Sequence, residues 1–452
     1  MILPLFLTSI FFSQAHPPAT EIVKPQEVRP LPGELDNIPV FNSNSPELIL
    51  SEGILLSTFP PENKKNPEAH LNFAFEGRFD IFAHHVAKPP TPEDLRTLYL
   101  GILVHNPNDK PVTVEILQGA SYLSQPDAPF IELPPVVDNP EGRVFAGPGS
   151  RVMNDVLRGK RQNIFPKKII IPPQQSRMLL NAPIPVRSLE PPLNGRSTYM
   201  RLESNGEVYV ASLAKYARRE RNGNEPSPSL SEWKSLLKNG RLSTPRDRVP
   251  TPPNTNVNQI IYGRVAGVAR GSVWNAELVD NSGDSYLTIP QAGEAFSYGM
   301  STLPKGQLGT NQNQSAEMLV RYPDTAYQAH GNYGVQYSLD LPLYNPSNQT
   351  KTVILTLQTP LKEDELSQKG LRFLEPVAPQ TFFRGTVRFR YINDRGKRQT
   401  RYIHLVQKRG QRGEPLVKLE IEPQQQRRVE FDFLYPPDAS PPQVLTVETL
   451  ED

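Results

Sequence analysis

Cysteine is absent from all 452 residues of the chain. This absence excludes disulfide bonds, zinc sites with thiolate ligands, iron–sulfur clusters and catalysis by a cysteine nucleophile. It is compatible with an exported chain that avoids oxidative mispairing, and equally with a cytosolic one. Cysteine usage therefore limits the chemistry without fixing the compartment.

The chain also has little excess of either charge and few tryptophans. The 49 Lys and Arg residues nearly balance the 47 Asp and Glu residues, so the formal net charge is only +2. A balance of this kind gives no global electrostatic argument for nucleic acid as a partner. Trp233 and Trp274 are the two tryptophans, which argues mildly against a sugar-binding face, although the 16 tyrosines leave one open.

Proline, by contrast, is abundant, with 49 residues in the chain against an average usage of roughly 5%. Proline cannot donate a backbone hydrogen bond and breaks the interior of helices. Hydrophobic residues make up 37% of the chain, which is enough for packed cores. The composition therefore predicts a mainly β protein with short strands, many turns and few long helices.

The N-terminus has the pattern of a signal peptide. Residues 2–12 form an apolar run, and Ser13 and Ala15 then provide the small residues of a cleavage site. No Lys or Arg precedes the run, so a buried N-terminal strand is the alternative. We predict a signal peptide over 1–15 and an exported protein that is periplasmic, outer-envelope or extracellular. No later stretch reaches the roughly 20 apolar residues of a membrane span, although peripheral contact with a membrane remains open.

Two segments of the chain share a series of sequence marks. Residues 99–117 and 337–357 each contain an extended apolar run, then Asn-Pro, a polar turn and a β-branched strand. Residues 169–180 and 419–431 each place a Pro-Gln turn between two strands. The dipeptide Ala-His precedes each series, at His84 and His330. The alternative is convergence on common turn chemistry, but the shared order favours an internal duplication.

The alternating strands and turns are typical of immunoglobulin-like or other β-sandwich domains. We therefore predict two related domains of this kind joined by a linker with one short helix, at 231–238. The expected parts are a proline-rich lead (16–45), domain one (46–220) with a long insertion (121–167), the linker (221–256) and domain two (257–452). Long insertions are more often functional or mobile than structural.

Four stretches of this sequence resemble an uncharacterised family. They are SNSPELIL (43–50), FEGRFDIFAHHVAK (75–88), SYLSQPDAPFIELPPVV (121–137) and AGPGSRVMNDVLRGKRQ (146–162). The resemblance is to exported proteins of cyanobacteria that are grouped only as a domain of unknown function, and it covers nearly the whole chain. It implies that the protein is secreted or located in the cell envelope. It carries over no catalytic residue, because the family has no established activity.

A group of polar residues near two expected strands is a candidate metal site. It consists of Asp80, His84, His85 and His105, whose carboxylate and imidazole groups would suit zinc or copper. Adjacent histidines point to opposite faces of a strand, so only one of His84 and His85 can join His105. The alternative is that these are hydrogen-bonded core or interdomain histidines. We therefore expect no resident cofactor, with a metal ion as the alternative.

Two further motifs fall short of known sites. Residues 280–284 place oxygens like a calcium loop, but the glycine and the final glutamate are missing from their places, so a β-turn is expected. Gly147-Pro148-Gly149-Ser150 precedes a short helical pattern and could bind an anion through backbone N–H groups. It lacks the ending of a phosphate-binding loop.

The C-terminal region contains a basic hairpin. Residues 386–392 and 400–406 alternate as strands around the turn 393–396. The candidate residues for binding an anionic envelope component or partner are Arg384, Arg388, Arg390, Lys397, Arg398 and Arg401. The alternative is a solvated sheet face whose charges protect an edge.

Two functional hypotheses follow. The first is a non-enzymatic envelope protein that binds a protein, a polysaccharide or an anionic component, because no catalytic motif is present. The second is an exported hydrolase or metalloenzyme with a site between the two domains, which would use Asp80, one of His84 and His85, and His105.

Overall fold

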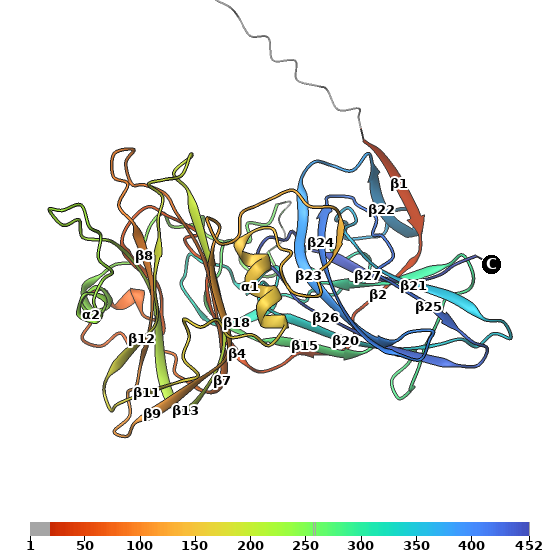
Figure 1. The fold of residues 1–452 in the computed structure, drawn as a ribbon, viewed down its shortest axis with the longest axis horizontal. Coiled ribbons are helices and arrows are strands. Elements are labelled where there is room, and N and C mark those ends of the chain that lie inside the picture. Colours follow the sequence, from red (N-terminus) through yellow and green to blue (C-terminus); the bar gives the residue numbers. More distant parts are fainter. Residues whose placement is uncertain (1–18, 256, 258, 452) are drawn as a thin grey trace, which may run out of the picture.

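The computed structural model describes residues 19–255, 257 and 259–451. The expected signal peptide, 1–15, lies outside these residues. The described chain is mainly β, as the proline content predicts, and its multiple sheets are accompanied by short helices. Figure 1 shows two β-rich lobes side by side, with helix α1 (Pro148–Leu157) where they meet.

The lobes are defined here by their strands. The first lobe contains β4 (Pro39–Ser43), β5 (Leu48–Ile49), β6 (Gly53–Ser57), β7 (Phe75–Ala87), β8 (Leu98–His105), β9 (Val112–Leu123), β11 (Lys168–Ile171), β12 (Ser176–Ile184), β13 (Asn194–Tyr216), β14 (Ala266–Arg270), β18 (Ala316–Arg321) and β19 (Gln328–Ala329). The second lobe contains β1 (Thr20–Pro25), β2 (Glu27–Arg29), β3 (Glu34–Leu35), β10 (Val136–Asp138), β15 (Val273–Glu277), β16 (Leu287–Thr288), β17 (Ala295–Met300), β20 (Gln336–Tyr344), β21 (Lys351–Gln358), β22 (Gly370–Glu375), β23 (Thr381–Ile392), β24 (Arg398–Lys408), β25 (Val417–Ile421), β26 (Gln426–Leu434) and β27 (Gln443–Thr449). The helical elements are α1, α2 (Leu230–Asn239) and the 3₁₀ turns η1 (Pro67–Ala69) and η2 (Ser367–Lys369).

Each lobe has its own hydrophobic core. The twelve strands of the first lobe form one hydrogen-bonded sheet system, whose inward-facing aliphatic and aromatic side chains include Phe79, Ile102 and Leu202. The second lobe combines an eight-stranded and a five-stranded sheet around Leu341, Phe389 and Phe431. Alternation of buried and exposed residues along the strands provides the apolar face that each core requires.

The N-terminal segment, which the sequence predicts as a proline-rich lead over 16–45, contributes strands to both lobes. Its first three strands all belong to the second lobe, where β1 pairs with β22, β2 with β17 and β3 with β15. The next strand, β4, crosses to the first lobe and pairs with β7 and β14. These three N-terminal strands lie at sheet edges, where proline is tolerated because one side of the strand needs no donors.

The expected boundary at residue 257 does not coincide with the sheets. Strands β14 and β18 follow that boundary in sequence, yet β14 pairs with β4 of the first lobe and β18 pairs with β14. The chain therefore passes between the lobes more than once. Each lobe contains strands from both the N-terminal and the C-terminal parts of the chain. The lobes therefore do not correspond to two consecutive segments.

A third apolar cluster joins the lobes. Helix α1 contributes Val152, Met153 and Val156, which are spaced on one helical face and pack with Phe82 and Tyr199 of the first lobe. The same helix contacts β23 and β26 of the second lobe. Helix α1 therefore lies in the interface and fixes the position of the insertion against both lobes.

The two marks that suggested a duplication have the same geometry in both lobes. Asn106 and Asn345 are fully buried, and each side-chain amide nitrogen donates its two shortest hydrogen bonds to carbonyl groups of its own lobe. The acceptors are Lys110 and Ile171 for Asn106, and Gln349 and Ile421 for Asn345. Gln174 and Gln424 both adopt a φ of 56° in the following turn.

Strand order also matches between the lobes. In the first lobe the order is β11-β9-β13-β7-β4, and in the second it is β25-β21-β27-β17-β2. In both, the last pair is parallel. The strands β8 and β12 pair in the first lobe as β20 and β26 do in the second.

The predicted linker helix is present as α2. Ser229 and Glu232 form a reciprocal capping box at its start, and Gly240 follows its last residue. Trp233 is fully buried and packs so closely on Gly101 that a Cβ there would lie 2.8 Å from the ring. Neither this helix nor α1 is long and apolar enough to cross a bilayer, and the same holds for every helix in the described residues.

Candidate functional site

Asp80, the first expected metal ligand, is a buried structural carboxylate on β7. Its Oδ2 atom accepts hydrogen bonds from the Tyr199 hydroxyl, at 2.7 Å, and from the Ser272 hydroxyl. Arg78 donates to the Oδ1 atom at 3.3 Å, and Arg201 lies 3.8 Å from Oδ2. Because Ser272 leads into β15 of the second lobe, this network ties the two lobes together.

His85 and His105 have separate partners. His85 is fully buried, with Nε2 2.9 Å from the Ser43 hydroxyl and Nδ1 2.8 Å from the carbonyl of Pro46. Burial lowers the pKa of His85 to about 3. His105, on β8, lies 3.1 Å from the hydroxyl of Ser176, the residue opposite it on β12. Within 19–255, 257 and 259–451, no three His, Asp or Glu side chains form a group that could hold a metal ion.

His84, the remaining candidate, lines a cleft of about 700 Å³ between the lobes. The first lobe supplies His84 and residues 44 and 47, and the chain after helix α2 supplies residues 246–248. Residues 261–265 and 330–333 come from segments where the chain passes between the lobes, and the second lobe adds Pro437 and Pro441. The cleft is therefore assembled from at least four distant parts of the sequence.

The charged side chains of the cleft are largely compensated within it. Arg264 spans two carboxylates, with 2.8 Å to Glu47 and 3.1 Å to Asp247. Arg246 donates two hydrogen bonds of 2.7 Å to Asp324 in a bidentate pair. The cleft consequently presents fixed donors and acceptors with little excess charge.

The two Ala-His marks of the sequence meet at this cleft. His84 Nδ1 lies 2.7 Å from the Ser197 hydroxyl, and His330 Nδ1 lies 3.3 Å from the Ser315 hydroxyl. His84 Nε2 is 3.9 Å from the carboxylate of Glu47. Burial lowers the pKa of His330 to about 4, so its imidazole is neutral at physiological pH.

Two polar side chains and an aromatic ring are further members of the cleft lining. The Oδ1 atom of Asn44 and the Nη1 atom of Arg246 are buried and have no hydrogen-bond partner in the described part of the chain. The Tyr262 ring packs edge-on against His330, with centroids 4.5 Å apart. The ring of Tyr262 therefore lines the cleft, whereas the two unpartnered atoms lie beneath its surface.

The basic hairpin forms as predicted, but its charges are engaged within the protein. Strands β23 and β24 pair in register around the turn 393–396. Arg388 and Arg390 both contact the buried carboxylate of Asp432, at 2.9 and 3.3 Å. Arg390 also pairs with Glu430. These acidic neighbours come from β26, which lies beside β23.

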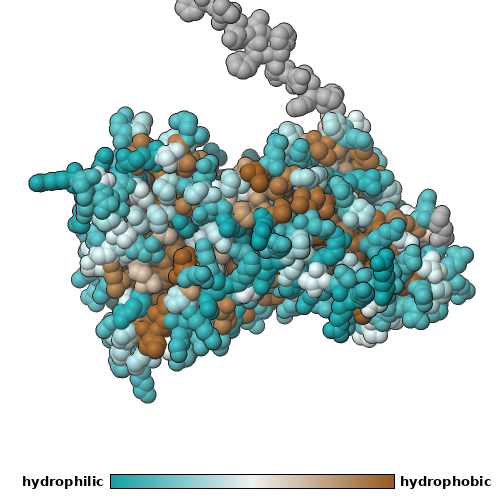
Figure 2. Space-filling view, in the orientation of Figure 1, coloured by the Kyte–Doolittle hydropathy of each residue, from teal (hydrophilic) through white to brown (hydrophobic). Residues whose placement is uncertain are grey.

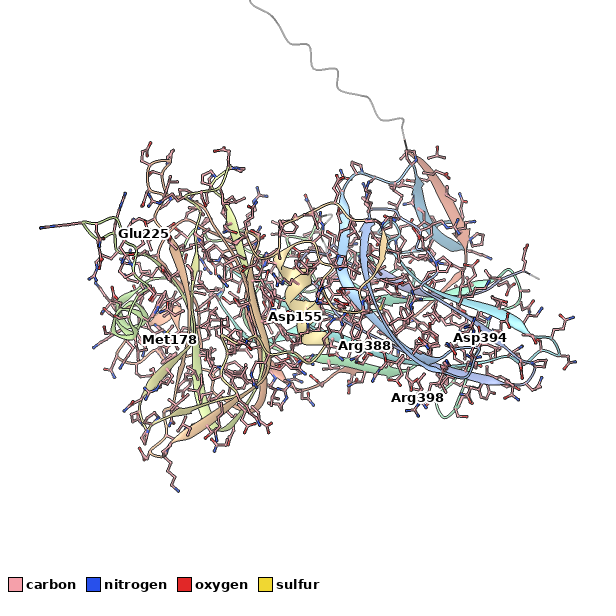
Figure 3. The ribbon with its side chains drawn as sticks, viewed as in Figure 1. Asp155, Met178, Glu225, Arg388, Asp394 and Arg398 are labelled. Atoms are coloured by element: carbon pink, nitrogen blue, oxygen red, sulfur yellow. The ribbon has the colours of Figure 1, made fainter. Side chains whose placement is uncertain are left out.

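The other hairpin candidates are spread along the second lobe. Arg401 pairs with Asp138 at 2.7 Å, and the Arg384 guanidinium lies 5.3 Å from the centre of the Phe130 ring. Lys397 and Arg398 are exposed at the start of β24. Figure 3 shows Arg388 near the junction of the lobes and Arg398 farther out on the second lobe. The structure therefore does not gather the six candidates into one free anion site.

The glycine-rich turn before α1 does meet an anion, which belongs to the chain itself. The backbone N–H of Ser150 donates to the carboxylate of Asp438 across 3.2 Å. The acidic segment that resembled a calcium loop is a turn, in which Asp284 accepts from the backbone of Asn281 at 2.9 Å.

Sequence reasoning missed most of the cleft. Glu47, Asp247, Tyr262 and Arg264 belong to no motif and are separated by long stretches of chain. The charged run 246–248 in the expected linker and the repeated Ala-His dipeptide were the available signals.

Comparison with known proteins gives a family and little else. A search of the curated proteins gave no match. One solved structure, "Crystal structure of Lac15 from a marine microbial metagenome", shares 10% identity over 83% of this chain and 55% of that chain, with a TM-score of 0.10. This chain thus spans about half the length of that protein, and a score this low supports no conclusion. A sequence family described as "Protein of unknown function (DUF3370)" matches residues 26–449. The chain belongs to the DUF3370 family.

Proposed function

We propose that this chain is an exported, non-enzymatic protein of the cell envelope that binds a neutral glycan in the cleft between its lobes. The observation that carries the proposal is the cleft itself, which has about 700 Å³ of space and is lined by charged side chains that compensate one another. Ligand sites typically occupy roughly 300–1,000 Å³ and lie where domains meet.

The chemistry of the cleft suits sugar hydroxyls. A hydroxyl both donates and accepts, so it can use carboxylate oxygens and guanidinium N–H groups together. Glu47, Asp247 and Arg264 provide such a set in fixed positions. The Tyr262 ring supplies an apolar surface for the C–H face of a sugar.

The binding role is favoured over hydrolysis by the pairing of the two carboxylates. A glycosidase needs one carboxyl group that can donate a proton and a second that acts as base or nucleophile. Glu47 and Asp247 both pair with the same guanidinium, that of Arg264, so the two carboxyl groups are already engaged within the cleft. Cleavage of the bound glycan would instead support the exported hydrolase.

We further propose that the lobes are two related immunoglobulin-like sandwiches that arose by duplication. The equivalent hydrogen bonds of Asn106 and Asn345 support this, as does the shared strand order. Export is supported by the apolar run at 2–12. The compartment would be the periplasm, the outer envelope or the extracellular space.

Glycan binding can be tested with purified protein and a panel of immobilised neutral oligosaccharides. The test variant is Glu47→Gln, and the matched control is Glu93→Gln, because Glu93 is exposed and lies outside the cleft. The account expects wild type and the control to bind one member of the panel, and Glu47→Gln to bind it about tenfold more weakly. Absence of binding to the whole panel would contradict the proposal, as would equal binding by the three proteins.

A further inference from the structure

A second hollow, of about 880 Å³, lies on the insertion beside helix α1. We call it the insertion groove, and all of its lining residues fall between 122 and 163. It is therefore separate from the cleft in sequence and in lining. Figure 3 places Asp155, one of its residues, on α1 near the junction of the lobes.

The insertion groove carries an excess of positive charge. Its lining includes four cationic and two acidic side chains, namely Arg143, Arg151, Lys160, Arg161, Glu141 and Asp155. Two of the cations are matched by these acids, since Lys160 lies 3.3 Å from Asp155 and Arg143 lies 3.1 Å from Glu141. The other two cations have no carboxylate partner in the described residues.

The two uncompensated guanidinium groups are nevertheless held in place. Arg151 donates to the carbonyl of Asp127, and Arg161 donates to the carbonyl of Ile116 at 3.1 Å. A carbonyl fixes the direction of a guanidinium without neutralising it, so the charge remains available to a ligand.

Arg151 is also positioned by two aromatic rings. Its guanidinium carbon lies 3.9 Å from the centre of the Tyr122 ring and 4.5 Å from that of Phe145. Contact with aromatic rings orients the planar group and leaves N–H edges for a bidentate contact with an oxyanion. The phenol of Tyr122 is fixed in turn, because it donates to Asp155 at 2.7 Å.

We propose that the insertion groove binds the acidic group of a sugar, a carboxylate or a sulfate, within an anionic polysaccharide. The side chains of Gln162 and Asn163 line the same hollow and offer hydrogen bonds to neighbouring hydroxyls. The Phe145 ring offers a surface for the sugar ring. This site is independent of the proposed cleft, which takes a neutral glycan.

The test compares two doubly substituted proteins that lose the same charge. Arg151→Gln with Arg161→Gln alters the insertion groove, whereas Lys397→Gln with Arg398→Gln alters exposed residues of the hairpin. The probes are polygalacturonate, dextran sulfate and neutral dextran, measured with the full chain at physiological ionic strength, after urea unfolding has shown that the variants are folded.

We expect wild type to bind at least one acidic polymer and not dextran. The groove variant should bind that polymer about tenfold more weakly, and the hairpin variant within about twofold of wild type. Equal losses of affinity in both variants would mean that only the net charge of the protein matters, and this would overturn the proposal.

Two further probes decide the source of the acidic group. The first probe is a vesicle that contains phosphatidylglycerol, and the second is inorganic phosphate. Binding of each probe is measured with the same proteins. Wild type could bind one of these two probes and none of the acidic polymers. If the groove variant then lost that binding, the assignment to a sugar would be overturned. Loss of polymer binding in Glu47→Gln with the groove intact would also contradict it, because the two sites would then not be independent.

Discussion

The carboxylate of Asp438 accepts a hydrogen bond from the backbone N–H of Ser150 and so places a second-lobe anion at the N-terminus of helix α1. At the other end, Arg388 donates to the carbonyl of Leu157 at 3.4 Å. An anion at the start and a cation at the end of a helix both interact favourably with its dipole. Helix α1 is thus fixed to the second lobe at both ends, which explains why the insertion is an ordered part of the junction.

Replacing Asp438 with Ala should destabilise the protein by about 1–2 kcal/mol, because the first turn of α1 loses its acceptor. Asp438→Asn should cost less, since the amide oxygen can still accept from Ser150. The measurement is urea unfolding of the three proteins. If the Ala variant were as stable as wild type, the contact would have no role in holding α1.

Arg388 should behave as a structural residue and not as a binding residue. Arg388→Gln removes one of two cations from the buried carboxylate of Asp432, and we expect a loss of about 2–3 kcal/mol in the free energy of unfolding. The control is Arg398→Gln, on an exposed residue of the same hairpin, which should change stability by less than about 0.5 kcal/mol. Equal effects at the two positions would contradict this assignment.

The equivalence of the lobes predicts equal effects at equivalent positions. Asn106→Ala and Asn345→Ala each remove one fully buried and one part-buried hydrogen bond to carbonyl groups of the turn region. Each should lower the free energy of unfolding by about 2–3 kcal/mol, as measured by urea denaturation. Asn222, which is exposed, provides the control Asn222→Ala, expected within about 0.5 kcal/mol of wild type. A large loss at one position and none at the other would argue against equivalent roles.

Acid should weaken the fold through its buried histidines. Burial lowers the pKa of His70, His330 and His404 to about 4 and that of His85 to about 3. In the unfolded chain these groups titrate near the ordinary value of about 6.5. Between about pH 6.5 and pH 4 the unfolded chain therefore binds more protons, and stability falls as the pH falls. Each histidine contributes up to about 1.4 kcal/mol per pH unit.

The variant His330→Gln isolates one of these contributions. Urea unfolding at several pH values between about 7 and 4 should show a shallower decline for the variant than for wild type. Parallel curves would mean that His330 titrates alike in the folded and unfolded chains. Carboxylates affect both proteins equally, so the difference between the curves reports the histidine.

Local features of the structure could be predicted from the sequence. The β23–β24 hairpin follows from alternating side chains around a turn at 393–396, and α2 follows from its serine cap and the glycine at its end. The Asn-Pro and Pro-Gln marks also indicated turns whose hydrogen bonds now match in both lobes. In each case the determining contacts lie within a few residues of one another, or in adjacent strands.

Features that depend on distant pairing could not be predicted. Strands β1 to β3 pair with strands hundreds of positions away, and no periodicity records such a partner. The arginines of the hairpin resembled a free patch because the acids that pair with Arg388 and Arg401, namely Asp432 and Asp138, lie elsewhere in the sequence. Figure 2 shows the hydropathy of one face, where hydrophilic side chains cover most of both lobes and apolar ones gather mainly near the junction.

The cleft is the central claim, and hydrogen exchange tests it most directly. Backbone exchange is measured by mass spectrometry for wild type with and without the neutral glycan that binds best in the panel. The account predicts slower exchange in 246–248, 261–265 and 330–333, which line the cleft, and little change in the insertion groove. Protection confined to other surfaces, or no protection at saturating glycan, would contradict it.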